Sequence, residues 1–81
     1  MNSLEVRYFA ILKELANCES EVVTLTHEKT YADLYQTLSH KYHFPLSIEL
    51  IQVAVNDEFD DLENFIKPGS RVVFIPPVAG G

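Results

Sequence analysis

The chain has 81 residues, enough for one small domain, and its hydrophobic fraction of 47% supports a modest core and excludes a disordered chain. Six Lys and Arg against 12 Asp and Glu give a net charge of −6, which argues against nucleic acids and anionic membranes as partners. No apolar run reaches membrane-spanning length, and no signal peptide is visible at the N-terminus. Together with a single cysteine, these features predict a cytoplasmic protein.

The first third of the chain predicts two strands around a short helix. Apolar and polar residues alternate over Leu4–Phe9, the period of a half-buried strand. Ala10–Asn17 is predicted to be a short helix. Its inward side is predicted to carry Ile11, Leu12 and Leu15. Glu21–Thr26 is rich in β-branched residues and predicts a second strand, paired with the first.

A longer helix is predicted in the middle of the chain. Thr30 has the side chain of a helix N-cap, and Asp33, three residues on, supplies the acid of a capping box. Large apolar and aromatic residues then recur at helical spacing, which predicts a helix over Tyr31–His43. Pro45 ends it, because the residue before a proline is disfavoured in the α conformation.

The last third predicts three strands and two tight turns. Ile51–Asn56 is a strand, and a turn at Asn56-Asp57-Glu58 leads into a short strand around Phe59. Lys67–Ser70 fits a type II turn, with proline at its second position and glycine at its third. Arg71–Ile75 is the most continuously apolar strand and is therefore placed at the centre of the sheet.

Strands outnumber helices, and one long helix must cover one face of the sheet, so the predicted class is α+β with two layers. If the first and last strands lie side by side, the sheet is mixed. A small mixed sheet packed on one main helix is the ubiquitin-like β-grasp arrangement. The predicted organisation is a β-grasp domain over residues 1–75 followed by a flexible C-terminal tail over residues 76–81.

The predicted tail has a composition suited to threading a narrow channel. Pro76 and Pro77 fix the backbone and stop the strand. Val78 and Ala79 form a short spacer, and Gly80 and Gly81 lack side chains that would obstruct passage. We therefore expect the α-carboxylate of Gly81 to be the reactive group, presented to the active site of another protein. The alternative is an ordinary frayed end.

Three other side chains are weaker candidates. Cys18 is predicted to lie in a loop among glutamates, whose charges would raise its pKa, so an incidental thiol is favoured over a reactive one. His40 and His43 have a spacing that can bind metal, but no third ligand accompanies them. We therefore predict no metal site and no bound cofactor.

Two groups of residues are predicted to face protein partners. Five acids occur within seven residues, a pattern that is either a solvated rim or a surface for a basic partner. The candidates for docking among them are Asp57, Glu58, Asp60 and Asp61. Phe9 and Phe74 are the candidates for an apolar contact patch, although a strand residue such as Phe74 is most simply explained as core.

Several short motifs resemble the small subunit of molybdopterin synthase, the MoaD family, over nearly the full length of the chain. The most specific is the terminal Pro-Pro-Val-Ala-Gly-Gly. The weaker ones are Tyr8-Phe9-Ala10, Ala54-Val55-Asn56 and Pro68-Gly69. The thiamine sulfur carriers (ThiS) also end in Gly-Gly but usually lack the double proline, so they are the second choice.

The resemblance implies a sulfur carrier with a β-grasp fold. An ATP-dependent, MoeB-like enzyme would adenylate the Gly81 carboxylate, and a sulfur donor protein would convert it to a thiocarboxylate. The MoaE-like large subunit of the synthase would then receive the tail. Sulfur would pass to a cyclic pterin phosphate precursor and form the dithiolene of molybdopterin. The implied assembly is a heterotetramer of large and small subunits.

The sequence shows no catalytic constellation of its own, so whether the chain counts as an enzyme stays open and a carrier subunit is expected. Two other functions are also open. One is a different ubiquitin-like carrier, feeding thiazole synthesis or tagging proteins. The other is a non-covalent β-grasp interaction domain whose Gly-Gly end is incidental.

Overall fold

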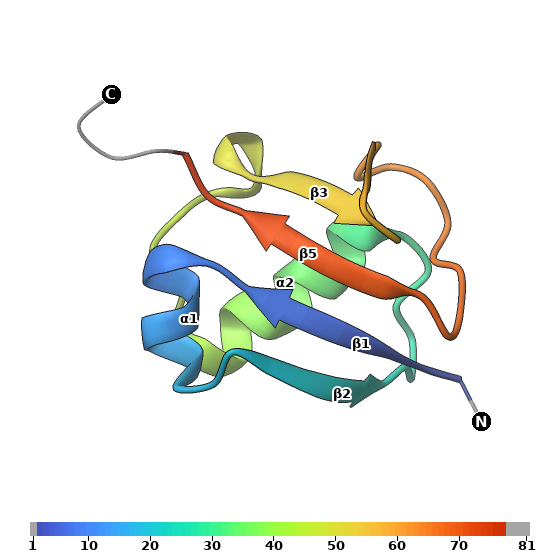
Figure 1. The fold of residues 1–81 in the computed structure, drawn as a ribbon, viewed down its shortest axis with the longest axis horizontal. Coiled ribbons are helices and arrows are strands. Elements are labelled where there is room, and N and C mark those ends of the chain that lie inside the picture. The colour runs from blue at the N-terminus through green and yellow to red at the C-terminus, as the bar shows by residue number, and fades with distance from the viewer. Residues whose placement is uncertain (1, 78–81) are drawn as a thin grey trace.

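A computed structural model describes residues 2–77 of the chain. Five strands form one sheet, and α2 lies across one of its faces (Figure 1). The elements in chain order are β1 (Ser3–Tyr8), α1 (Ala10–Ala16), β2 (Ser20–Thr24), α2 (Tyr31–Tyr42), the 3₁₀ turn η1 (Ile48–Leu50), β3 (Gln52–Val55), β4 (Glu58–Asp60) and β5 (Arg71–Ile75). The predicted α+β class and β-grasp arrangement are confirmed, with strand ends shifted by one or two residues.

The sheet has the order β2-β1-β5-β3-β4, so β5 is central as the sequence predicted. It runs parallel to β1 and antiparallel to β3, while β1–β2 and β3–β4 are antiparallel pairs. The sheet is therefore mixed. Figure 1 shows β5 between β1 and β3, with α1 at one end of the sheet.

The core lies between the sheet and α2, and the alternation along the strands determines which side chains enter it. Leu4, Val6 and Tyr8 are buried as predicted, and so are alternate residues of β3 and β5. Aromatic rings fill the centre, where Tyr35 of α2 and Phe74 of β5 lie 5.4 Å apart between ring centroids. Burying such rings is the main stabilising contribution in a domain of this size.

Helix α2 begins with the signal read from the sequence and ends one residue before the predicted end at His43. The Thr30 side chain accepts a hydrogen bond from the Asp33 amide, and Asp33 accepts one from the Thr30 amide, so the capping box is confirmed. The helix ends at Tyr42, and His43 adopts a left-handed conformation (φ 59°) as its C-cap. No helix within residues 2–77 is long and apolar enough to cross a membrane.

Both predicted turns are present. Asn56 (φ 51°) and Asp57 (φ 73°) have the two positive φ angles of a type I′ hairpin turn, which joins β3 to β4. At the second turn Gly69 has φ 82°, and the Ser70 amide donates to the Lys67 carbonyl at 3.2 Å. Both features match the type II turn expected there.

The inward side of α1 differs in part from the prediction. Leu12 and Ala16, four residues apart, are the buried residues of this helix, whereas Ile11 is 43% and Leu15 38% exposed. The helix is only seven residues long and starts at Ala10, which has a positive φ of 52°. Leu12 is thus confirmed as an inward residue, and Ala16, four residues on, completes the buried side in place of Ile11 and Leu15.

Glu28 anchors the loop before α2 and provides a test of pH-dependent stability. Burial opposes its ionisation, but hydrogen bonds from the Thr26 amide and the Thr37 hydroxyl outweigh burial and lower the pKa of Glu28 to about 2. Because the folded pKa lies below the ordinary value of 4.5, ionised Glu28 stabilises the fold above that value. This stability is lost as the pH falls from about 5 toward 2.

We expect Glu28→Gln to lower the free energy of unfolding by about 2–3 kcal/mol at neutral pH and by far less near pH 2. Urea unfolding at several pH values would measure the difference. Glu14→Gln, in an exposed residue of α1, is the control and should change stability little at any pH. If Glu28→Gln lowered the free energy of unfolding by the same amount at every pH, this account would be contradicted.

Candidate docking face and carrier tail

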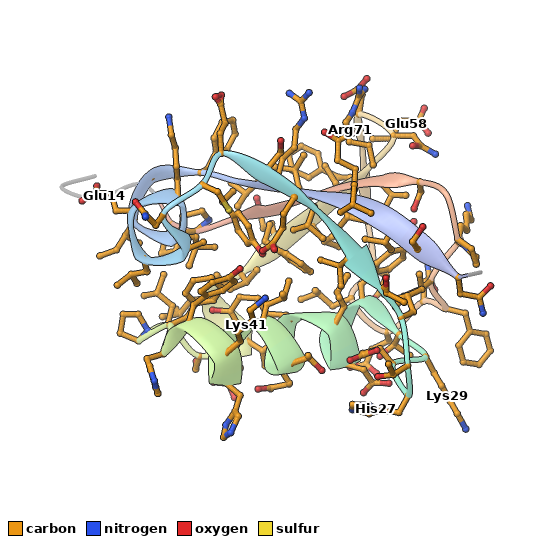
Figure 2. All side chains as sticks on the ribbon, turned by 90° about the horizontal axis from the view of Figure 1, so that it is seen from below. Glu14, His27, Lys29, Lys41, Glu58 and Arg71 are labelled. Carbon is orange, nitrogen blue, oxygen red and sulfur yellow. The ribbon has the colours of Figure 1, made fainter. Side chains whose placement is uncertain are left out.

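The face of the sheet opposite α2 carries a row of neighbouring side chains from four strands. The strand registers place Arg7 beside Val73, Val73 beside Ala54, and Ala54 beside Phe59. Residues paired in this way point to the same face of a sheet. Figure 2 shows Arg71 and Glu58 on the side of the sheet away from α2. The row is therefore directed outward, away from the core.

This face includes an apolar surface, which we call the outer patch and define as Phe9, Ala54, Phe59, Val73 and Ile75. Phe59 is 75% exposed and Phe9 57% exposed, although both side chains are large and apolar. A slot of about 410 Å³ lies within the face and is lined by Phe9, Val73 and Ile75 together with Arg7 and Arg71. Exposed aromatic side chains flanked by polar residues are typical of a protein-binding surface.

The segment that follows β5 starts beside the outer patch. Ile75 belongs to the patch and is followed directly by Pro76, which is buried, and Pro77, which is exposed. Val78, Ala79, Gly80 and Gly81, to which the sequence assigned tail threading and the reactive carboxylate, lie outside the described residues. The patch and the root of the predicted tail are therefore adjacent.

The predicted apolar contacts are partly right. Phe9 is exposed and lines the slot, in keeping with a docking role. Phe74 is 0% exposed and packs against Tyr35 on the opposite face of β5, so its prediction as a docking residue is wrong. Its neighbours Val73 and Ile75 point outward instead. Sequence reasoning missed Phe59, whose place becomes clear only once β4 is known to pair with β3.

The acidic docking candidates do not form one uniform group. Asp57 is held by Arg71, with 2.6 Å between the Asp57 carboxylate and the guanidinium. Glu58 is exposed on β4. Asp60 accepts hydrogen bonds from the Asp61 amide and the Asn64 side chain, which lower the pKa of Asp60 and keep it ionised. Asp57 is thus neutralised locally, whereas Asp60 and Asp61 remain available to a partner.

Cys18 has the features of an inert thiol, as the sequence predicted. It is half-buried, and burial raises its pKa. The charge of Glu21 acts in the same direction, while Lys41 acts against it. Glu21 also accepts hydrogen bonds from Tyr8 and Tyr42 at 2.5 and 2.6 Å. Cys18 is therefore a protonated thiol at neutral pH, and a poor nucleophile.

The two helix-end histidines are not part of a metal site within residues 2–77. No group of three or more His, Cys, Asp or Glu side chains in that part of the chain could hold a metal ion. His40 lies near the end of α2, and His43 is its C-cap.

Comparison with known proteins places this fold in a family. The family model described as the ThiS family matches residues 6–81. The molybdopterin synthase sulfur carrier subunit of Drosophila yakuba is 34% identical over 82 aligned residues, which cover 98% of this chain and 91% of that protein.

Two solved structures share the fold. SAMP1 from Haloferax volcanii has a TM-score of 0.76 and 26% identity, covering 98% of this chain and 99% of that one. A chain in the complex of subunits 1 and 2 of the molybdopterin-converting factor from Helicobacter pylori has a TM-score of 0.64 and 28% identity, with coverage of 98% and 99%.

The chain belongs to the ThiS family of ubiquitin-like proteins, because the family model matches nearly its whole length. The mixed sheet packed on one helix and the outer patch beside the start of the Gly-Gly tail agree with this class. The chain is a sulfur carrier of the ThiS and MoaD type. The resemblance to the molybdopterin synthase small subunits is confirmed by the 34% identity to one of them.

Proposed function

We propose that this chain is the sulfur-carrier small subunit of a molybdopterin synthase and that Gly81 carries the sulfur. The Gly81 carboxylate is adenylated by an ATP-dependent, MoeB-like partner. A sulfur donor protein then converts the acyl-adenylate to a thiocarboxylate. This thiocarboxylate gives its sulfur to a cyclic pterin phosphate precursor, which becomes the dithiolene of molybdopterin.

The proposed chemistry accounts for the residues at the end of the chain. A carboxylate is a poor electrophile, and adenylation gives its carbon a good leaving group. Glycine at position 81 leaves that carbon unhindered, and Gly80 allows the backbone to bend within a narrow active site. The thiocarboxylate is a softer nucleophile than a carboxylate, so the chain acts as a mobile arm in covalent catalysis.

One observation carries the proposal: the outer patch is adjacent to the root of the tail. Ile75 lies in the patch, and Pro76 and Pro77 follow it directly. A partner that covers the patch is thereby positioned to receive the segment that leaves β5. Six extended residues span roughly 20 Å, which is enough to reach a buried catalytic centre.

The partner that we propose for the outer patch is the MoaE-like large subunit. The Helicobacter pylori relative was solved as a complex of subunits 1 and 2 of its converting factor. We expect the same kind of pairing here, within a heterotetramer of two large and two small subunits. We also propose that this chain binds no cofactor itself, that the activating partner uses the ATP, and that the reducing cytoplasm is where they meet.

The role of the outer patch can be tested with two equally exposed phenylalanines. Phe59 lies in the patch, whereas Phe65, in an isolated bridge to Thr30, lies outside it, and both are 75% exposed. We expect Phe59→Asp to weaken binding to the large subunit by at least about 30-fold, since central aromatic residues of an interface contribute about 2 kcal/mol or more. Phe65→Asp should have little effect. Isothermal titration calorimetry measures both, and equal losses would contradict this assignment.

A second candidate function comes from the same comparisons. The matching family model bears the name ThiS, and SAMP1 is described as a small archaeal modifier protein. A carrier for thiazole synthesis, or a protein tag, would use the same tail. Co-purification with the pterin synthase large subunit favours our proposal, whereas co-purification with a thiazole synthase, or covalent conjugates through Gly81, would favour the alternative.

The experiment that tests the proposal is the intact mass of the protein from cells that make the cofactor, followed by sequencing of its C-terminal peptide. We expect a sulfur-for-oxygen exchange on Gly81. Localisation matters because oxidation of Met1 gives nearly the same change in mass. An unmodified Gly81, still unmodified after incubation with the activating enzyme, ATP and a sulfur source, would reject the carrier chemistry.

A further inference from the structure

A second surface lies at the open end of the β3–β4 hairpin, away from the turn at Asn56 and Asp57. Here β3 starts at Gln52 and β4 ends at Asp60, and the two chains diverge toward η1 and the turn after β4. A groove of about 730 Å³ fills the space between them. We call it the hairpin groove, and it is lined by residues of η1, β3, β4 and the segment up to Glu63.

The hairpin groove combines an apolar floor with acidic walls. Its accessible apolar lining is formed by Ile48, Phe59 and Leu62, whereas Ile51 and Val53, which also line it, are buried in the core. Carboxylates stand on both sides, with Glu49 on η1 and Asp60, Asp61 and Glu63 on the facing segment. The lining contains no Lys or Arg.

None of these four carboxylates has an ion-pair partner among residues 2–77, a property they share with Glu14, Glu19, Asp33 and Glu58; what sets them apart is that all four line one groove. Glu5, Glu21 and Asp57 each lie within 4 Å of an Arg or Lys nitrogen. One oxygen each of Asp60 and Asp61 accepts hydrogen bonds from within their own segment, which fixes the direction of these carboxylates. The groove therefore surrounds an apolar floor with four negative charges, two of which, Asp60 and Asp61, are held in place by hydrogen bonds.

We infer that the hairpin groove binds an extended segment of a protein partner in which Lys or Arg residues alternate with apolar ones. Apolar side chains of that segment would rest on Ile48 and Leu62, which are both half-buried. Its cations would reach Glu49 on one wall and Asp61 and Glu63 on the other. A purely apolar occupant would leave four carboxylates unpaired beside it, and a purely basic one would leave the floor exposed.

The position of the groove relative to the outer patch supports a protein partner. Phe59 belongs to the patch and also lines one end of the groove. A protein docked on the patch could therefore extend one segment across Phe59 into the groove. This inference does not depend on the sulfur chemistry of Gly81, so the mass experiment and the test below can fail independently.

The test uses the full-length ¹⁵N-labelled protein and a short synthetic peptide of alternating Lys and Leu. We expect amide shift changes confined to residues 48–53 and 59–63, and an affinity that falls as salt is added. A peptide of alternating Glu and Leu should not bind, and one of alternating Lys and Ser should bind more weakly. Equal binding of the Lys-Leu and Lys-Ser peptides, or shifts spread over every acidic surface, would overturn the inference.

Two charge reversals provide a matched control. Glu49 lies in the groove and Glu14 on α1, both exposed, so Glu49→Lys and Glu14→Lys change the net charge equally. We expect Glu49→Lys to weaken binding of the Lys-Leu peptide by at least about fivefold, because repulsion replaces an exposed ion pair. Glu14→Lys should weaken binding much less. If both variants weakened peptide binding equally, only the net charge would matter, and the inference that the hairpin groove is the binding site would be overturned.

Discussion

Adding one residue after Gly81 is expected to abolish sulfur transfer while leaving the fold intact. The added residue moves the reactive carboxylate by one peptide unit and replaces glycine at the reacting position. Displacing a reacting group by about 1 Å already costs on the order of 100-fold in rate, so the loss should be at least that large. Gly81→Ala should act in the same direction, because a methyl group then stands beside the carbon that must be adenylated.

The measurement is dithiolene formation by the reconstituted synthase, with the melting temperature taken on the same samples. The control places the same extra residue before Met1, at the other end of the sequence, and should transfer sulfur normally. Normal transfer by the C-terminally extended protein, with the extension shown by mass to be uncleaved, would refute the role of Gly81. An altered melting temperature would instead show that the tail contributes to the fold.

Phe74→Ala is expected to produce the largest loss of stability in the described part of the chain. The side chain is 0% exposed and packs edge to face against Tyr35, with 5.4 Å between ring centroids. Removing a buried phenylalanine ring typically costs about 3–5 kcal/mol, since apolar contact is lost and a cavity remains. That is a large share of the roughly 5–15 kcal/mol that holds a small domain together.

For a domain of this size, 3 kcal/mol corresponds to a fall of roughly 15 °C in melting temperature, which differential scanning calorimetry measures directly. Phe59→Ala is the control and should change stability by less than about 0.5 kcal/mol, because Phe59 is exposed. For binding to the partner we expect the opposite ranking of the two positions. Substitution of Phe59 should weaken binding, whereas the Phe74→Leu variant should bind almost as well as the unaltered protein. Loss of binding by a stably folded Phe74→Leu variant would restore Phe74 as a docking residue.

Elements with strong local signals could be predicted from the sequence. The capping box of Thr30 and Asp33, the Pro68-Gly69 turn and the alternation along β1 are properties of a few neighbouring residues, and all three are present. The central place of β5 followed from its nearly continuous apolar character. These features sufficed for the fold class because each depends on contacts within a few residues.

Features that depend on pairing between distant segments could not be predicted. Which residues of β5 point inward is decided by the strands on either side, so the sequence left Phe74 both as a core residue, which is confirmed, and as a docking candidate, which is wrong. Phe59 joins the outer patch only because β4 pairs with β3. In α1 the apolar residues Ile11, Leu12 and Leu15 formed a plausible inner face, but of these only Leu12 is buried, and the small Ala16 joins it.

The position of β5 determines how the molecule responds to force. The segment after Ile75 is attached to a strand that is held by β1 on one side and β3 on the other. A pull along that strand loads the hydrogen bonds of both ladders in shear, so many must break together rather than one after another. We therefore expect the domain to stay folded when the proposed partner pulls on the segment that follows Ile75, because both ladders share the load.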